Sequence, residues 1–308
     1  MSSSIKKKTG DYIKDLEVGP ISIKAAIYDL EVRQAKTGKK YLYLRLGDKT
    51  DVVTALYFTD NEREVDEGIR RYHVGQVVEV SGLVDKYKKR LNIKIKPPLV
   101  DSLVLCSEDE FDLSDYRSVT EGDVDVMLNK INDYVDDFKN PYLKKLCLSF
   151  LDDPDFMRKF NMAPGAQSKH HNYAGGLLEH TLEMLELGEI ICGFHSELDR
   201  DLLFSGIILH DVGKLDSYRY RGASIERTDE EKLIGHIVLG DRMVWEKMNE
   251  IKDFPEELKL KISHLILSHH GEIQKGYGSA VNPGMPEAHI LHHIDNADSQ
   301  IKLIVQKM

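Results

Sequence analysis

The chain has 308 residues, which is the usual length of two domains. Hydrophobic residues make up 41% and charged residues 31%, as in a globular protein with a packed core. The formal net charge of −10, taken alone, argues against a protein that binds nucleic acid, because phosphate groups are bound by positive charge. The charge is uneven, however, since residues 1–105 carry a net +5 and residues 106–308 carry −15. The first third of the chain therefore has the charge that a nucleic-acid partner requires.

The three cysteines, Cys106, Cys147 and Cys192, lie far apart, and no CxxC motif is present. This pattern indicates reduced thiols and predicts a cytoplasmic protein. No apolar run reaches the ~18 residues of a transmembrane helix, and the basic run at residues 6–8 is not followed by the apolar stretch of a secretory signal. We therefore expect no membrane partner, and no sequence pattern specifies the oligomeric state.

Apolar and polar residues alternate through the first hundred positions, as in the segment with Leu42, Leu44 and Leu46. Such alternation predicts half-buried strands, and a segment of helical composition follows the third of them. The expected strands are 19–32, 40–47, 51–58, 76–86 and 90–96, and the expected helix is 61–72. Three strands, a helix and two strands resemble the element order of an OB-fold, so residues 1–100 are predicted to form a five-stranded OB-fold β-barrel.

Basic and aromatic residues lie where an OB-fold binds its ligand, which is on strands 2 and 3 and the loops between strands 1–2 and 4–5. Cations beside aromatic rings suit single-stranded RNA or DNA, because bases stack on the rings. The alternative is that the loop lysines are ordinarily solvated and that Tyr41 and Tyr43 only pack on the barrel exterior. OB-like barrels also serve as protein-interaction modules. The candidate nucleic-acid-binding residues are Arg33, Lys36, Lys39, Lys40, Tyr41, Tyr43, Arg45, Lys86, Tyr87, Lys88, Lys89 and Arg90.

The hydrophobic period changes after Pro97-Pro98, which ends the last expected strand. Residues 101–120 contain an acidic run and little periodicity, so we interpret them as a linker. From residue 121 to 308 the period is helical, and no strand pattern appears after residue 110, which predicts an all-α second domain. Residues 120–123 have the pattern of a helix start with a hydroxyl N-cap, and a helical stripe runs from Val126 to Phe138. Further helices are expected at 141–151, 154–160, 175–193, 199–211, 229–249, 255–269 and 286–304.

Twelve of the thirteen histidines follow residue 169. Several of them, together with two aspartates, lie within or at the end of apolar helical sequence on five different expected helices. Neutral imidazole and carboxylate are ligands for a divalent metal, and a helical bundle can direct side chains from facing helices to one point. No thiolate accompanies them, which disfavours a structural zinc site. The set is His180, His210, Asp211, His236, His269, His270 and Asp295.

These residues match the H…HD…D signature of the HD superfamily of metal-dependent phosphohydrolases, and the extra histidines match its two-metal members. The segments 175–181, 278–288 and 291–296 further resemble the YhaM-type 3′-to-5′ exoribonucleases, in which an OB-fold precedes an HD domain. The resemblance implies a manganese-dependent enzyme that trims single-stranded RNA or DNA from the 3′ end. It also implies that residues 121–308 form an all-helical HD phosphohydrolase domain.

By this resemblance, Asp211 would bridge two divalent ions, and Asp295, rather than Asp298 one turn later, would be a ligand because Asn296 follows it. A metal pair can ionise a water and stabilise both oxygens of an in-line displacement on phosphorus. The expected ion is Mn²⁺, although Mg²⁺, Co²⁺, Fe²⁺, Ni²⁺ and Zn²⁺ accept ligands of these types. One ion would be held by His180, His210, Asp211 and Asp295, and the other by Asp211, His236, His269 and His270.

Three further residues are candidates for substrate contact. Lys214 follows Asp211 by three positions and could neutralise a phosphate oxygen, unless it is a surface lysine after a helix end. His170 and His171 precede the first glycine segment and could contact the substrate phosphate, or lie solvated in a loop.

Two other functions compete with the exonuclease. An HD enzyme could hydrolyse small nucleotides or cyclic dinucleotides and use the barrel as a regulatory or interaction module, but the GYP motif of cyclic-dinucleotide enzymes is missing. A non-catalytic adaptor is disfavoured because the sequence has a metal-binding residue at each of the seven ligand positions. The choice between RNA and DNA, the physiological metal and the substrate in the cell stay open at the level of sequence.

Overall fold

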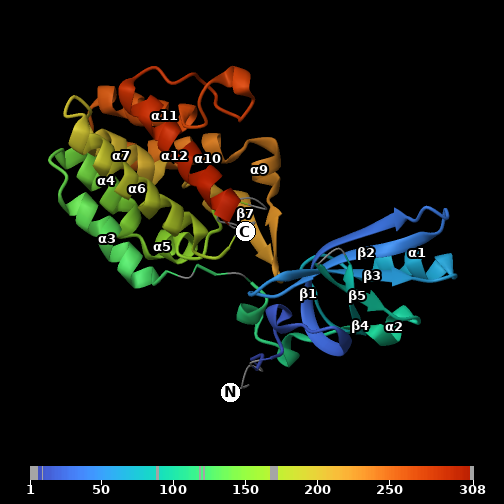
Figure 1. Ribbon diagram of the computed structural model, residues 1–308. Coiled ribbons are helices and arrows are strands. Elements are labelled where there is room, and N and C mark those ends of the chain that lie inside the picture. The colour runs from blue at the N-terminus through green and yellow to red at the C-terminus, as the bar shows by residue number, and fades with distance from the viewer. Residues whose placement is uncertain are drawn as a thin grey trace. The chain divides into compact units, whose positions relative to one another are not determined.

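The computed structural model describes residues 6–8, 10–87, 90–117, 119–120, 122–166 and 173–305, without the side chains of residues 221 and 224. The chain divides into two compact units (Figure 1). The first comprises Met1–Ser118 together with Tyr220–Glu226, and the second comprises Val119–Arg219 and Arg227–Met308. Each unit has a hydrophobic core of its own.

The first unit is built on a sheet whose strand order is β1-β2-β3-β5-β4-β6. The long strand β1 pairs with β4 through its first half and with β2 through its second half, which closes a ring of five strands. Within that ring β3 and β5 run parallel, and the other pairs are antiparallel. This is the strand arrangement of an OB-fold. The strands are β1 Gly19–Gln34, β2 Lys40–Gly47, β3 Val52–Phe58, β4 Val77–Tyr87, β5 Arg90–Ile95 and β6 Leu103–Leu105.

The alternation in β2 has the predicted consequence. Leu42, Leu44 and Leu46 are fully buried inside the ring, whereas Tyr41 and Tyr43 are half-buried on its outer face. Helix α1 (Glu62–Arg71) starts at the N-cap Asn61, whose side chain accepts a hydrogen bond from the Arg63 amide. Val65 and Ile69 of this helix pack against the core of the ring.

The expected linker 101–120 contains regular structure. Helix α2 (Leu99–Ser102) leads into β6, which pairs with β4 from Val78↔Leu105 to Val80↔Leu103. Leu103 is buried in the first core, so these residues belong to the sheet unit. A three-residue strand is too short to show an alternating period, which explains why the sequence did not predict it. Short 3₁₀ turns lie at η1 Ile13–Asp15, η2 Glu108–Glu110 and η3 Leu113–Asp115.

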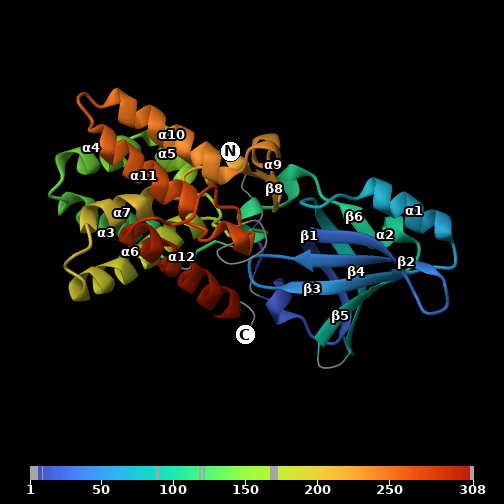
Figure 2. The same ribbon diagram turned by 90° about the horizontal axis from the view of Figure 1, so that it is seen from above.

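The second unit is helical (Figure 2), and its helices share a single large hydrophobic core. Asp123, Asn140 and Asp153 cap the first three helices by accepting hydrogen bonds from first-turn amides. Helices α7 and α12 pack against each other, and each of them also packs against α6 and α11. The helices are α3 Val124–Asp136, α4 Pro141–Leu151, α5 Pro154–Phe160, α6 Gly176–Phe194, α7 Arg200–Leu209, α8 Lys214–Ser217, α9 Asp229–Leu233, α10 His236–Glu250, α11 Glu256–Ser268, η4 Ile273–Lys275 and α12 Pro286–Val305.

Two expectations for this unit need correction. The helix expected over 229–249 is interrupted at Gly235, whose φ of +84° favours glycine and separates α9 from α10. The expectation of no strand after residue 110 is wrong, because β7 (Tyr218–Arg221) and β8 (Ser224–Arg227) form a two-stranded sheet. Four-residue strands are again too short for a period. The N-terminal sheet followed by a helical domain nevertheless has the predicted fold class.

The tip of the β7–β8 hairpin is part of the first unit. The Ala223 amide donates to the Gly75 carbonyl oxygen at 3.0 Å, and Arg117 donates through Nε and Nη2 to the Gly222 carbonyl oxygen at 2.9 and 2.7 Å. A Cβ at Gly222 would lie 2.1 Å from the Gly75 oxygen, so only glycine fits this close approach.

None of the helices in the described parts of the chain is both long enough and apolar enough to cross a membrane.

Candidate metal centre

Helix ends and helix interiors of the second unit bring the seven predicted metal ligands together. His180 lies in the second turn of α6, His236 is the first residue of α10, and Asp295 lies in the middle of α12. The other four follow the ends of α7 and α11, where the chain leaves the helix: His210, Asp211, His269 and His270. Four of the seven are buried in an apolar core, which is costly unless their charges and lone pairs are compensated.

Asp211 occupies the middle of this cluster. Its Oδ2 lies 3.1 Å from Nε2 of His210, and its Oδ1 lies 3.6 Å from Nε2 of His236 and 3.7 Å from Nε2 of His269. One carboxylate therefore faces histidines from three different segments. This placement suits a bridging ligand.

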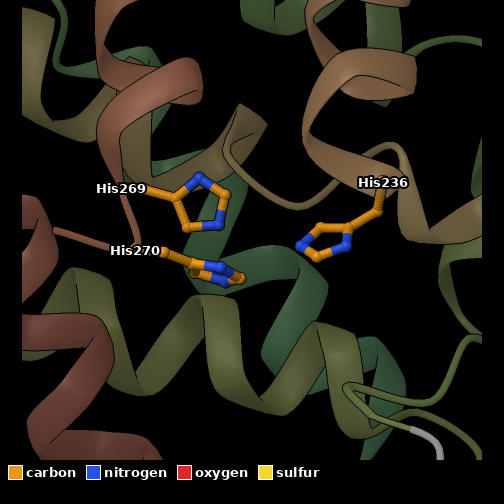
Figure 3. A group of neighbouring side chains, drawn as sticks. All are labelled: His236, His269 and His270. Carbon is orange, nitrogen blue, oxygen red and sulfur yellow. The ribbon is translucent and has the colours of Figure 1, made fainter. Parts of the chain in front are cut away.

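Two groups in the cluster have the compactness of metal sites. Within each group, one ligand atom of every member lies within 4.8 Å of the others. The first group is His180, His210 and Asp211, and the second is His236, His269 and His270. In the second group the rings of His269 and His270 face that of His236 (Figure 3), with ring centres 5.9 and 5.2 Å away.

Backbone carbonyls define the protonation of three of the imidazoles. Nδ1 of His210 lies 2.7 Å from the Ile207 oxygen, and Nδ1 of His269 lies 2.7 Å from the Ile266 oxygen. His270 makes the same kind of contact, 2.6 Å, with the oxygen of Tyr277. A carbonyl oxygen only accepts, so each Nδ1 donates, and the neutral ring keeps its lone pair on Nε2.

Several acceptor atoms of the cluster lack donors. Within the described residues, no hydrogen-bond partner is present for Nε2 of His210, His236 and His269 or for Oδ1 of Asp211. Buried acceptors that converge without a donor are unusual unless a cation completes them. A divalent ion fits this donor set, because neutral imidazoles and a carboxylate are its ligands and a fixed Nδ1–H orients each ring.

The carboxylates of Asp295 and Asp298 each face one ring nitrogen of His180. Asp295 Oδ1 is 3.4 Å from Nε2, whereas Asp298 Oδ2 is 2.6 Å from Nδ1. The two aspartates lie one turn apart on α12, so one helix supplies both carboxylates. In the sequence, Asp298 stood only as an alternative ligand to Asp295. The contact of Asp298 with His180 was not predicted.

The electrostatics of the cluster follow from burial and close charges. Burial raises the pKa of the Asp211 carboxyl, but nearby positive charge, first that of Lys214, outweighs it and holds that pKa well below its ordinary value. Burial also lowers the pKa of His269 well below its ordinary value, with His270 acting in the same direction. For His180, burial lowers the pKa, but Asp295 and Asp298 outweigh it and raise the pKa to about 9. The carboxylate and the His269 imidazole are therefore already in the ionisation state that binds metal.

Lys214 is not a solvated surface lysine. It is the first residue of α8, its side chain is 9% exposed, and its Nζ lies 2.5 Å from Asp211 Oδ2. The ammonium also donates to the Gly165 carbonyl oxygen at 2.5 Å. Its charge is therefore held beside the ligand cluster, where a substrate phosphate would also need neutralisation.

A second carboxylate was missed by sequence reasoning. Glu231, on the short helix α9, places Oε1 3.7 Å from Nδ1 of His236. Burial raises the pKa of Glu231, but hydrogen bonding to His236 and Ser217 outweighs it and leaves that pKa lower than usual. No periodicity in the sequence distinguishes this glutamate from its acidic neighbours.

The predicted nucleic-acid residues lie on the first unit, and several have partners there. The Arg33 guanidinium lies 3.4 Å from the ring centre of Tyr43 and donates to Glu31 at 2.7 Å. Tyr41 stacks on Phe58 with ring centres 4.6 Å apart. Two lysines lie close to carboxylates, in the pairs Lys39–Asp60 at 2.5 Å and Lys40–Asp66 at 3.7 Å.

The remaining candidates are exposed or undescribed. Tyr87 at the end of β4 is 66% exposed, which leaves ring surface on which a base can stack. Lys36, Arg45, Lys86 and Arg90 are also exposed. The predicted contacts Lys88, Lys89, His170 and His171 lie outside the described residues.

Solved structures share features with parts of this chain at low overall similarity. The first is a replication protein A heterotrimer bound to ssDNA, 14% identical, covering 31% of this chain and 64% of that chain with a TM-score of 0.22. Another is the second OB-fold domain of replication protein A from Methanococcus maripaludis, which is 20% identical. The match covers 34% of this chain and 97% of that chain with a TM-score of 0.22. Asparaginyl-tRNA synthetase from Pyrococcus horikoshii is 11% identical. The match covers 85% of this chain and 62% of that chain with a TM-score of 0.24. The strand pairings, rather than these scores, support the OB-fold.

The helical unit matches a known family. Residues 177–300 match the HD domain, and all seven residues of the cluster lie within that segment. An HD domain indicates a metal-dependent phosphohydrolase. The chain therefore combines an N-terminal sheet with OB-fold strand order and a helical HD domain that contains a His/Asp cluster suited to divalent metal.

Proposed function

We propose that this protein is a metal-dependent 3′-to-5′ exonuclease that hydrolyses single-stranded RNA, with single-stranded DNA as a second substrate. The observation that carries the proposal is the set of buried, donor-less Nε2 atoms that surround Asp211 within an HD domain. The closed strand ring that precedes this domain supplies a module of the kind that binds single strands. The direction of cleavage comes from the resemblance to YhaM-type exoribonucleases.

The proposed ligands divide into two sets that share Asp211. His180, His210 and Asp295 would complete one set, and His236, His269 and His270 would complete the other. Bound divalent ions, for which we propose Mn²⁺, supply a water of lowered pKa and positive charge for the reacting phosphate. The Nδ1–H donors of the histidines hold the rings in place.

Lys214 has a separate role in this proposal. Its buried ammonium lies beside Asp211, so a phosphate bound at the cluster would come within reach of a fixed positive charge. Such charge stabilises the transition state more than the ground state if it faces an oxygen on which negative charge develops. The apolar helices behind the cluster exclude bulk water and strengthen this effect.

The barrel would bind the single strand away from its 3′ end. Its exposed Tyr87, with the exposed cations Lys36, Lys86 and Arg90, offers stacking and charge. Tyr41 and Tyr43 lie on the face of β2 opposite the leucines, where the OB-fold binds its ligands. These contacts would favour long substrates over short ones.

The test uses the full-length protein, Mn²⁺ and a single-stranded oligonucleotide labelled at either end. We expect early release of the 3′ label as a mononucleotide and stepwise shortening of the 5′-labelled strand. RNA and DNA of the same sequence give the substrate preference. If neither strand shortens while small phosphodiesters are hydrolysed, the exonuclease proposal is wrong.

A second candidate is a phosphohydrolase of small nucleotides with the barrel as a regulatory or interaction module. The ion pairs of the barrel favour it, since Arg33, Lys39 and Lys40 each lie close to a carboxylate and offer less free charge to phosphate. A panel of nucleotides and dinucleotides distinguishes the two functions, because a small-nucleotide enzyme should turn these over faster than a long strand.

A further inference from the structure

His180 differs from His210, His269 and His270 in what it contacts through Nδ1. His210, His269 and His270 use backbone carbonyl oxygens. His180 instead uses a carboxylate, Asp298 Oδ2, at 2.6 Å. Both side chains are buried, with 1% and 8% exposure, so little water competes with this contact.

Helix α12 supplies the carboxylates on both sides of the His180 ring. Asp295 faces Nε2 and Asp298, one turn later, faces Nδ1. The spacing of three residues puts both on the same side of α12, against α6. The ring therefore has one orientation in which both nitrogens meet an acceptor.

A network of charged side chains lies next to the His180–Asp298 pair. Lys302 lies one turn beyond Asp298 on α12. Its Nζ donates hydrogen bonds to Glu179 at 2.6 Å and to Glu183 at 2.7 Å, and both glutamates lie on α6. Hydrogen bonding between Glu183 and Asp298 links this network to the pair. The contacts tie α12 to α6 on both sides of His180 and limit movement of Asp298.

We propose that Asp298 is a positioning residue, which holds the His180 ring with its proton on Nδ1 and thereby directs a more basic Nε2 to a divalent ion. The proposal rests on the metal centre of the proposed function and adds a residue that is not itself a ligand. A carboxylate that accepts from a ligand histidine fixes the ring and increases its basicity, and loss of such a partner weakens metal binding 10–100-fold. Asp298 would thus determine the affinity of the ion held by His180, His210, Asp211 and Asp295.

The experiment compares full-length Asp298→Asn and Asp298→Ala with the wild type. Each protein is freed of metal with a chelator, its fold is checked by circular dichroism, and Mn²⁺ is titrated while free Mn²⁺ is followed by electron paramagnetic resonance. The matched control is Asp201→Asn, because Asp201 is also a buried helical aspartate but accepts from the Lys139 and Asn140 amides. His180→Ala serves as the reference for loss of the ligand itself.

We expect both Asp298 variants to bind one Mn²⁺ about 10- to 100-fold more weakly than the wild type, and the Asp201 control to bind like the wild type. Binding within twofold of the wild type in both Asp298 variants, with a lost ion in His180→Ala, would overturn the role of Asp298 and leave the metal centre standing. If His180→Ala also binds Mn²⁺ like the wild type, the metal centre itself is wrong, and this role with it.

A measurement on the unmutated protein keeps the proposal testable if the Asp298 variants do not fold. Nitrogen-15 NMR of the metal-loaded protein, with a diamagnetic ion such as Zn²⁺ and His180 assigned by its variant, reports which ring nitrogen carries the proton. A proton on Nδ1 supports the proposal. A proton on Nε2 would refute it, because that atom would then be unable to bind the ion.

Discussion

Lys214 Nζ lies 2.5 Å from Oδ2 of Asp211, and both side chains are buried in the helical unit. Asp211 is also the carboxylate that faces His236 and His269. The protein therefore holds a fixed positive charge at the centre of the proposed metal cluster. In the metal-free chain, this ammonium compensates a carboxylate that would otherwise be buried without a counter-charge.

The Lys214→Met variant tests that compensation. Without metal, it leaves Asp211 buried beside a neutral side chain, and we expect the free energy of unfolding to fall by about 3–5 kcal/mol. Mn²⁺ should restore much of this loss, because the ion takes over the role of counter-charge. Urea unfolding with chelator and with Mn²⁺ measures both values. Lys232→Met, which removes an exposed lysine near Asp229, should have no measurable effect, and an equal loss with and without Mn²⁺ would contradict the prediction.

Asp211→Ala is expected to abolish nuclease activity and leave binding of single-stranded RNA largely intact. The variant removes the one carboxylate that faces both histidine groups, whereas the proposed strand contacts lie on the first unit. Cleavage of an end-labelled oligonucleotide and a filter-binding assay measure the two properties. The control is Asp216→Ala. Asp216 is close to Asp211 in sequence, is more exposed and forms an ion pair with Lys159. Unchanged cleavage in Asp211→Ala would refute its central role.

Combined Tyr41→Ala and Tyr43→Ala should weaken binding of long single strands by ~1–3 kcal/mol for each base that stacks there. Hydrolysis of very short substrates should change little, because these do not reach the barrel. Equilibrium binding of oligonucleotides of increasing length tests this. Phe194→Ala removes an aromatic ring that is 83% exposed on the helical unit and serves as the control. If the wild type handles long and short substrates equally well, the barrel has no such role.

Glu183 should make the stability of the metal-free protein depend on pH. Burial, followed by hydrogen bonding with Asp298, raises its pKa to about 7 from 4.5. An acid whose pKa is higher in the folded than in the unfolded state stabilises the fold below the unfolded value, and this contribution is lost as pH rises through the folded value. The difference in free energy of unfolding between wild type and Glu183→Gln should therefore decline from about pH 4.5 to about pH 7 and be constant above it. A difference that does not vary with pH would contradict the assignment.

The elements of this protein could be predicted closely from local sequence patterns. The alternation around Leu42 and Leu44 and the helical period after residue 121 gave strand and helix ranges that the structure reproduces within a few residues, and the strand order agrees with an OB-fold. The short elements were missed. Strand β6 and the β7–β8 hairpin are stabilised by pairing with other strands, so their own residues carry little periodic signal.

The seven residues of the proposed metal cluster were chosen from residue type, local context and family resemblance, because histidine within apolar helical sequence is unusual and these positions are ordered as in HD enzymes. What each nitrogen and carboxylate contacts was not predictable. Asp298 and Asp295 have similar sequence environments, yet one faces Nδ1 and the other Nε2 of His180. Lys214 was equally compatible with a surface position, and only the packing of the second unit buries it.

The sequence by itself determined two domains, their strand and helix periods, a positive first third and a histidine-rich second part, because composition and period are local properties. The tertiary structure alone decided that Asp211 faces His236 and His269, that Lys214 is a buried partner of Asp211 and that Asp298 lies on His180. These relations join groups far apart in the chain, at distances set by how helices pack. The net charge of −10 similarly says little about phosphate binding, which depends on where the charges lie.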